Sequence, residues 1–325
     1  MKPTKILIFR VSSLGDFIHA TPAIKLIRQK NPSAKIYFSS QKKNSVGFVT
    51  PDLLPFKKKI IDEFIFYNNN YLSLFFFLIK IFRKKFDKLY YLNEFTTKSR
   101  EKRDYLFFKM CKIKEMHGFN LKGKNTDEER HNYIKFNETY YLCRTVDKHV
   151  KNNQISYSNL FQNKFYSKKK YMTISMGGRN IKKTWKFKNW EILIKKMTNN
   201  FPNLKIKIVG SKNETSNAKK ICKINKNQII NMCGKTTVKS LFKIINSSQY
   251  HISHDDGTMH VASVYKKRGA VIFGLTAPKG RWFPLNKKQK IFYPIKDINE
   301  FDPDYIFKKI YYDLKKFKII SYSFF

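Results

Sequence analysis

Apolar and polar positions alternate along the first half of the chain in a pattern of short strands and longer helices. Apolar runs of strand length occupy residues 5–11, 35–39, 60–66 and 88–92. Apolar residues recur at helical spacing in residues 17–30, 71–85 and 96–111, and residues 128–149 predict a longer closing helix. Strands that alternate with helices are typical of βαβ units, so this half predicts a parallel sheet.

A second unit of the same kind follows a polar segment. Residues 151–170 are rich in Asn, Ser and Lys without periodicity, which indicates a linker. Beyond it, strands are predicted at residues 171–175, 205–209, 229–231, 249–253 and 269–273. Helices are predicted at residues 189–200, 214–224, 238–246, 257–265 and 302–318. A chain of 325 residues exceeds one ordinary domain. We therefore expect two doubly wound α/β domains, residues 1–160 and 168–325, that face each other across a cleft. The last helix belongs to the second domain or packs back on the first.

The charge of the chain is strongly basic. There are 66 Lys and Arg against 23 Asp and Glu, a formal net charge of +43. This imbalance suggests a polyanionic partner, which can be nucleic acid, an acidic membrane surface or a phosphorylated substrate. However, the basic residues run from end to end and form no nucleic-acid-binding module, and Lys, Asn, Ile, Phe and Tyr are all abundant, so much of the charge reflects composition. We expect no nucleic-acid partner, and keep as the competing class a basic α/β binding protein for nucleic acid or another anionic polymer.

Cysteine usage and hydropathy bear on where the protein works. The four cysteines are scattered without a Cys-x-x-Cys pair, which favours a reducing, cytoplasmic compartment. Residues 1–5 lead straight into the first strand and do not resemble a signal peptide. The apolar run Tyr71–Ile79 is too short to cross a bilayer. It predicts either a buried helix or a basic-flanked helix that rests on anionic lipid at the inner face of the cytoplasmic membrane.

The turn after the first strand carries a candidate functional carboxylate. Residues 5–22 read KILIFRVSSLGDFIHATP, in which Asp16 opens the first helix. A carboxylate at the carboxyl end of a parallel strand lies where open α/β sheets place their ligands. The alternative is that Asp16 only caps its helix, because Asp is a favoured N-cap residue.

A second candidate site follows the strand at 249–253. Residues 254–260 read HDDGTMH, and a glycine at a strand-to-helix turn lets backbone N–H groups approach an anion. Two acids and two histidines also suggest a metal site. Adjacent Asp255 and Asp256 do not easily converge on one ion, so no metal is expected.

Two shorter stretches add weaker signals for the same ligand. Gly177, Gly178 and Arg179, with Lys182 and Lys183 close behind, can cradle a diphosphate. The alternative is a solvated basic loop. After the next strand, Glu214 can accept hydrogen bonds from ribose hydroxyls, or serve as an ordinary first-turn helix Glu.

Together these motifs resemble the glycosyltransferase family 9 heptosyltransferases of lipopolysaccharide core synthesis. The opening KILIFRVSSLGDFIHATPAIKLIR resembles the N-terminal block of the family, and HDDGTMHVASVYKKRGAVIFGLTAPKGRWFP resembles its C-terminal signature. Between them, GGRNIKKTW resembles the phosphate-contacting loop and VGSKNE the ribose-binding stretch. The resemblance is thin over residues 41–170.

The resemblance implies a GT-B fold and an inverting, metal-independent transfer of a heptose from a nucleotide diphosphate donor, ADP-heptose first of all. The acceptor would be a lipopolysaccharide core or another phosphorylated glycolipid, and no cofactor is implied. The family's catalytic Asp falls on Asp16, with Ser12, Ser13 and Gly15 beside it on the acceptor side. The donor-side residues expected are Gly178, Arg179, Lys183, Glu214, Asp255, Gly257, Thr258 and His260.

The chain departs from the family pattern at three positions. Asp256 stands where Thr or Ser is usual, and Gly178 and Arg179 lack the expected hydroxyl side chains. A carboxylate beside a diphosphate would repel it unless Arg179, Lys182 or Lys183 compensates. An inactive relative that still binds sugar nucleotide is therefore a further alternative.

A mechanism can be stated from the chemistry of the reaction. An acceptor hydroxyl needs a base, for which Asp16 is the candidate. The departing nucleoside diphosphate gains negative charge, which Lys183 and the N–H groups near Gly257 would stabilise. Closure of the two domains about residues 151–170 would bring the substrates together.

Overall fold

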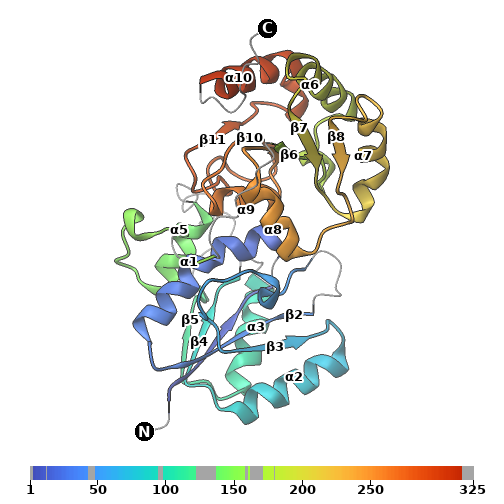
Figure 1. The fold of residues 1–325 in the computed structure, drawn as a ribbon. Helices are drawn as coiled ribbons and strands as arrows, with labels where there is room; N and C mark the ends of the chain where they lie inside the picture. Colours follow the sequence, from blue (N-terminus) through green and yellow to red (C-terminus); the bar gives the residue numbers. More distant parts are fainter. Residues whose placement is uncertain are drawn as a thin grey trace. The chain divides into compact units, whose positions relative to one another are not determined.

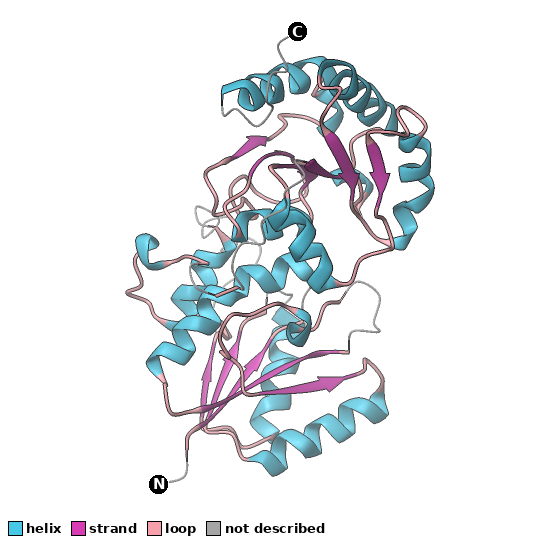
Figure 2. Ribbon diagram, viewed as in Figure 1, coloured by secondary structure: helices cyan, strands magenta, loops and turns pink. Residues whose placement is uncertain are grey.

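The computed structural model divides the chain into two compact units, residues 1–162 and 163–325. It describes residues 3–11, 13–42, 48–93, 98–121, 137–157, 160–161, 171–178 and 180–316. Each unit contains one wholly parallel sheet with helices around it (Figures 1 and 2). Within the described residues, no helix is long and apolar enough to span a bilayer.

Unit 1 is built on a five-stranded parallel sheet of order β3-β2-β1-β4-β5. The strands are β1 (Lys5–Phe9), β2 (Lys35–Gln41), β3 (Glu63–Tyr67), β4 (Lys88–Tyr91) and β5 (Glu115–His117). The helices are α1 (Leu14–Lys30), α2 (Tyr71–Lys84), α3 (Lys98–Met110) and α5 (Glu138–Val146). The predicted alternation is confirmed in its order, and β5 is an additional strand. Much of the helix expected at 128–149 lies outside the described residues, and α5 begins at Glu138 after the N-cap Asn137.

The alternation of side chains along the strands distributes these helices over two faces of the sheet. Leu7 and Tyr37 point to one face, where they share a core with Phe77 of α2 and Phe108 of α3. Phe38, the next residue after Tyr37, points to the other face, where the ring of Phe17 from α1 packs edge-on against it. Helix α5 lies along α1 on that second face (Figure 1).

The first part of the segment expected as a linker is integrated into unit 1. Tyr157, Leu160 and Phe161 are buried. Phe161 forms a bridge with Phe56, and their rings stack with centroids 5.2 Å apart. A polar composition here therefore did not mean a free segment, because a few apolar residues anchor it. Residues 162–170 lie outside the described part of the chain.

Unit 2 is built on a six-stranded parallel sheet of order β11-β10-β9-β6-β7-β8. The strands are β6 (Tyr171–Ser175), β7 (Lys205–Ile208), β8 (Ile229–Asn231), β9 (Tyr250–His254), β10 (Arg268–Ile272) and β11 (Gln289–Phe292). The helices are α6 (Phe187–Asn200), α7 (Thr215–Cys222), α8 (Val238–Ser247), α9 (Gly257–Val264) and α10 (Pro303–Lys316). Strand β11 was not predicted. Helix α10 packs against α6, with Ile306, Ile310 and Leu314 fully buried in the core of unit 2.

Both sheets reverse their strand order beside a central strand. In unit 1 the chain leaves β1 for β2 and β3, then crosses to β4 on the other side of β1. In unit 2 it leaves β6 for β7 and β8, then crosses to β9 on the other side of β6. Ligands of open α/β sheets bind outside the carboxyl ends of the strands at such reversals. The ends of β1 and β4, and of β6 and β9, are therefore the places to examine for a site.

Candidate active site

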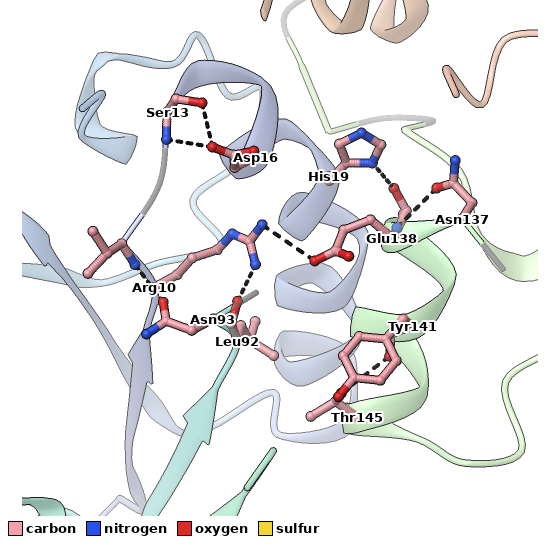
Figure 3. Close-up of polar contacts among 12 residues, drawn as sticks. Arg10, Ser13, Asp16, His19, Leu92, Asn93, Asn137, Glu138, Tyr141 and Thr145 are labelled. Atoms are coloured by element: carbon pink, nitrogen blue, oxygen red, sulfur yellow. Dashed lines mark hydrogen bonds and ion pairs between the residues drawn. The ribbon is translucent and has the colours of Figure 1, made fainter. Parts of the chain in front are cut away.

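In unit 1, Asp16 lies in the first turn of α1, directly beyond the end of β1. Helix α1 begins at Leu14 with Ser13 as its N-cap, so Asp16 occupies the third helical position. Its carboxylate accepts a hydrogen bond from the Ser13 N–H at 2.9 Å and another from the Ser13 hydroxyl (Figure 3). The alternative interpretation had Asp16 as the N-cap, but the N-cap is Ser13. Asp16 is the acidic partner of a capping box, which fixes the direction of the carboxylate.

The other acceptor-side residues predicted from the sequence are placed only in part. Gly15 is buried in the first turn of α1. Ser13 is the residue that orients Asp16. Ser12 lies outside the described residues.

A buried arginine beneath this turn was not found from the sequence. Arg10 is fully buried; its guanidinium donates to the Leu92 carbonyl oxygen and lies 3.9 Å from the Glu138 carboxylate. Alongside, the Val11 N–H donates to Asn93 Oδ1 at 2.8 Å, which joins the ends of β1 and β4 (Figure 3). The sequence signal that could have identified Arg10 is a basic residue at the end of an apolar strand. These contacts connect the turn that carries Asp16 to β4 and α5.

A cavity of about 780 Å³ opens at the carboxyl ends of β1, β2 and β3 in unit 1. Phe9 and Val11 line it, immediately before the turn that leads to Asp16. Its other walls come from the start of α2 and from α3, where aromatic rings stand beside Arg100 and Arg103. The cavity can therefore hold a ligand that has an apolar or sugar-like body and an anionic group.

In unit 2, the start of α9 joins the ends of the two central strands. Asp256 is the N-cap of α9 and accepts hydrogen bonds from the N–H groups of Thr258 (2.7 Å) and Met259 (3.2 Å). Its other oxygen accepts from the Ser175 hydroxyl at the end of β6, at 2.7 Å. Two of the first helical N–H groups are thus bonded to Asp256, so an anion at this helix start would have to use the remaining one, that of Gly257.

Lys183 reaches the same place from the turn Ile181–Lys183. Its ammonium lies 2.6 Å from Asp255 Oδ2, and the Asp255 side chain is only 6% exposed. Gly274, just after β10, allows this turn to lie close to the end of the strand, because an added Cβ would lie 2.1 Å from the Lys182 carbonyl oxygen and 2.8 Å from Lys183 Cα. Gly274 was not singled out from the sequence. The structure therefore pairs Lys183 with Asp255, two residues before Gly257 at the start of α9.

Glu214 lies over two glycines at the ends of neighbouring strands. An added Cβ would come within 1.8 Å of Glu214 Oε1 at Gly177, and within 2.2 Å of Glu214 Oε2 at Gly210. The carboxylate also accepts a hydrogen bond from the Ser211 N–H. This brings the two weak motifs, GGR and VGSKNE, to one edge of the sheet. Gly178 follows Gly177 in the same loop, and Arg179 lies outside the described residues.

The histidines of β9 are buried and hydrogen-bond neighbouring segments. His254 Nε2 accepts a hydrogen bond from the backbone N–H of Trp185 at 3.0 Å. Its Nδ1 lies 3.2 Å from the Gly177 carbonyl oxygen, to which it donates. Burial lowers the pKa of His254 to about 4, so the ring is neutral at pH 7. The side chain therefore connects the Gly177 loop to the loop that carries Lys183.

A second buried histidine supports the cap of α9. His251 Nδ1 lies 2.8 Å from the Thr173 hydroxyl, and Nε2 lies 3.0 Å from the Thr258 hydroxyl. That hydroxyl donates to Asp256 at 2.6 Å, so it accepts from His251. The Thr258 side chain is thus directed into the protein, and His260 is buried in α9 with 3% exposed.

No metal centre is apparent in the part of the chain that the structure describes: no three His, Cys, Asp or Glu side chains come together in a way that could hold an ion. The chemistry available at the two strand edges is a carboxylate in unit 1 and a Lys–Asp pair beside a helix start in unit 2.

Comparisons with known proteins show the family and the fold of the chain. The model of "Glycosyltransferase family 9 (heptosyltransferase)" matches residues 139–310, just over half of the chain. A lipooligosaccharide heptosyltransferase 2 of Campylobacter jejuni (serotype O:6, strain 81116) is 28% identical over 84% of this chain and 82% of its own length. The corresponding protein of C. jejuni serotype O:2 is 27% identical over 84% of this chain and 81% of its own.

Solved structures show the same fold at low sequence identity. A family 9 glycosyltransferase from Veillonella parvula superposes with a TM-score of 0.74 at 14% identity, covering 97% of this chain and 99% of that one. E. coli ADP-heptose lipopolysaccharide heptosyltransferase II gives 0.69 at 14% identity, covering 97% and 100%. E. coli heptosyltransferase WaaC with ADP gives 0.67 at 15%, covering 95% and 100%. The two parallel sheets are therefore those of a GT-B fold, and the chain belongs to glycosyltransferase family 9, the heptosyltransferases.

Proposed function

We propose that this heptosyltransferase takes its sugar from ADP-heptose, transfers it with inversion to a phosphorylated sugar of a lipopolysaccharide core, and needs no metal ion. The observation that carries the proposal is the Lys183 ammonium, held 2.6 Å from Asp255 at the reversal point of unit 2. It supplies a fixed positive charge at a helix start, which is where a diphosphate binds most favourably. The solved relatives that carry ADP or an ADP-heptose analogue support this choice of nucleotide.

The proposed reaction is a single displacement. The acceptor oxygen attacks the anomeric carbon from the face opposite the diphosphate, while the bond from that carbon to the phosphate oxygen breaks. The acceptor proton passes to the Asp16 carboxylate. The nucleoside diphosphate leaves with the bonding electron pair, and Lys183 with the Gly257 N–H stabilises its charge. One displacement inverts the anomeric centre.

We place the acceptor sugar at the cavity of unit 1. The cavity adjoins the residues that lead to Asp16, and Arg100 and Arg103 on its wall suit a phosphate group. Arg103 is itself oriented by Asp104, which it contacts through Nε at 3.0 Å and Nη2 at 2.6 Å. Asp104 is also held by the Tyr91 hydroxyl at 2.7 Å. The guanidinium is thus positioned before any ligand arrives.

The base assignment is tested with Asp16→Asn. We expect turnover to fall by about 10²–10⁴-fold, the range for loss of a general base, while the Kd for ADP measured by calorimetry changes less than twofold. Ser13→Ala is the matched control: it removes the hydroxyl that orients the carboxylate but keeps the carboxylate itself, so its loss should be smaller. Equal losses of turnover and of ADP affinity in Asp16→Asn would contradict the assignment.

The donor assignment is tested with Lys183→Gln and a panel of nucleoside diphosphates. ADP should raise the Tm of the wild type more than UDP or GDP does, and Lys183→Gln should remove most of that shift. Addition of EDTA should leave turnover unchanged. A shift that survives in Lys183→Gln would place the diphosphate elsewhere.

A further inference from the structure

The outer face of α2 is apolar, where a helix that faces solvent is normally polar. Leu72, Phe75 and Phe76 are 68%, 57% and 59% exposed, and Phe82 is 44% exposed. The opposite side of the same helix is buried in the core of unit 1 through Phe77. Exposed apolar side chains that gather on one helix face usually mark a surface that contacts protein or lipid.

The charged residues around this face are basic. Helix α2 contains no acidic residue, and its Lys80 and Arg83 are exposed, followed by exposed Lys85. The remaining basic residue, Lys84, is paired with Glu63 at 3.2 Å.

The end of α3 extends the same surface. Met110 is 60% exposed, and the Lys112 ammonium lies 5.8 Å from the centre of the Phe82 ring. Both acidic residues of α3, Glu101 and Asp104, are buried. We call this surface the α2 face; it comprises Leu72, Phe75, Phe76, Lys80, Phe82, Arg83, Lys85, Met110 and Lys112.

We propose that the α2 face docks on an anionic lipid bilayer. Apolar side chains that can enter the headgroup region, together with cations that attract acidic lipids, are what an interfacial helix needs. A second copy of the chain suits the face less well, because a symmetric dimer would bring like charges together. With 14 residues, α2 is about 21 Å long, so it would lie along the membrane surface.

The position of α2 relates this surface to the acceptor. Tyr71 and Leu74, in the first turns of α2, also line the cavity of unit 1. Docking through the α2 face would therefore hold the mouth of the proposed acceptor site close to the membrane that carries a lipid-linked acceptor. This last step rests on the proposed function, whereas the docking itself does not.

Co-sedimentation of the full chain with vesicles tests the docking. We expect binding to vesicles that contain phosphatidylglycerol, weaker binding to pure phosphatidylcholine, and weakening of the former as salt rises. Phe75→Ser with Phe76→Ser should reduce the partition coefficient by more than about tenfold. Lys80→Glu with Arg83→Glu should reduce it by roughly 25-fold or more, since each basic residue near the surface contributes about fivefold.

Two matched variants in unit 2 serve as controls. Ile295→Ser with Tyr312→Ser changes two exposed apolar side chains, and Lys219→Glu with Lys239→Glu reverses two exposed charges. Both should bind vesicles within twofold of the wild type. Equal losses in the control and α2 variants, or binding that ignores lipid charge, would overturn the proposal. A dimer in light scattering that becomes a monomer in Phe75→Ser/Phe76→Ser would also overturn it, because the face would then be an interface between copies.

A second readout separates this proposal from the proposed function. The α2 variants should keep wild-type turnover on a delipidated, water-soluble acceptor and lose turnover on an acceptor embedded in vesicles. If neither the wild type nor any variant acts on either acceptor, the proposed function fails, and the vesicle-binding result stands on its own.

Discussion

At the scale of single residues, Asp256 shows how a departure from the family pattern is accommodated. A carboxylate beside a diphosphate was expected to repel it. In the structure the carboxylate is directed into the start of α9, where it accepts hydrogen bonds from Ser175 and Thr258. It therefore performs the N-cap function for which Ser, Thr and Asp are all suited. Desolvation nevertheless raises the pKa of Asp256 from 3.8 to about 6.

This raised pKa predicts a pH-dependent stability that Asp256→Asn should remove. A carboxyl whose pKa is higher in the folded state destabilises the fold when it is ionised, above about pH 6, and ceases to do so as the pH falls towards 4. Asn is an equally good N-cap without charge. We expect Asp256→Asn to raise the free energy of unfolding of unit 2 by on the order of 3 kcal/mol at pH 8 and by only about 1 kcal/mol at pH 4.5.

Urea unfolding followed by tryptophan fluorescence measures this change, because Trp185, Trp190 and Trp282 all lie in unit 2. Asp302→Asn, at an exposed position just before α10, is the control for the substitution itself. A gain from Asp256→Asn that is the same at both pH values would show that the buried charge is not its cause.

Another buried charge predicts a loss of stability in unit 1. Arg10 and Glu138 are both fully buried and pair across 3.9 Å. Removal of one member leaves the other as an uncompensated charge, which typically costs about 3–5 kcal/mol. Glu138→Ala should therefore lower the urea concentration at which unit 1 is half unfolded. Limited proteolysis of the full chain at increasing urea, followed by the appearance of peptides from unit 1, measures this midpoint. Glu63→Ala, which breaks exposed ion pairs, should lower the stability by less than about 1 kcal/mol.

At the scale of elements, hydrophobic periodicity was sufficient to predict most helices and strands. Periodicity could not predict β5, because its sequence Glu-Met-His contains no apolar run and the strand lies at an edge of the sheet. It placed the start of α1 three residues late, since Ser13 and Asp16 form a cap that hydrophobicity does not reveal. The residues at both reversal points were located because motifs follow strand ends. The close contacts of Gly177 and Gly274 were not, because they depend on which backbone or side chain another loop brings near.

The close contacts at Gly177 and Gly274 predict how substitution of each glycine changes the stability of unit 2. An added Cβ at Gly177 would meet the Glu214 side chain, whereas one at Gly274 would meet the backbone of the Lys182–Lys183 turn. Each Gly→Ala change should destabilise unit 2 by about 1–3 kcal/mol. Glu214→Ala should relieve most of the cost of Gly177→Ala, but Lys183→Ala should not relieve Gly274→Ala, because the obstructing atoms remain. Double-mutant cycles with tryptophan fluorescence measure both couplings, and relief in both cycles would contradict the backbone contact.

At the scale of the whole molecule, each unit carries its own reversal point and its own part of the proposed chemistry. The proposed base and acceptor cavity belong to unit 1, and the proposed diphosphate site belongs to unit 2. Since each unit has a separate core, a ligand bound within one unit should stabilise that unit in the first place. Binding can therefore be assigned to a unit without knowledge of the reactive complex.

Hydrogen exchange of the full chain in the presence of ADP tests this assignment. At 100 times its Kd, a ligand stabilises the unit that binds it by about 2.7 kcal/mol, which slows the exchange of amides that require unfolding of that unit by about 100-fold. We expect this slowing in peptides that cover β6, β7 and β9, and little change in peptides that cover β1 and β2. Lys183→Gln under the same conditions should show much less. Slowing confined to unit 1 would contradict the donor site, and equal slowing in both units would show that they unfold together as one cooperative body.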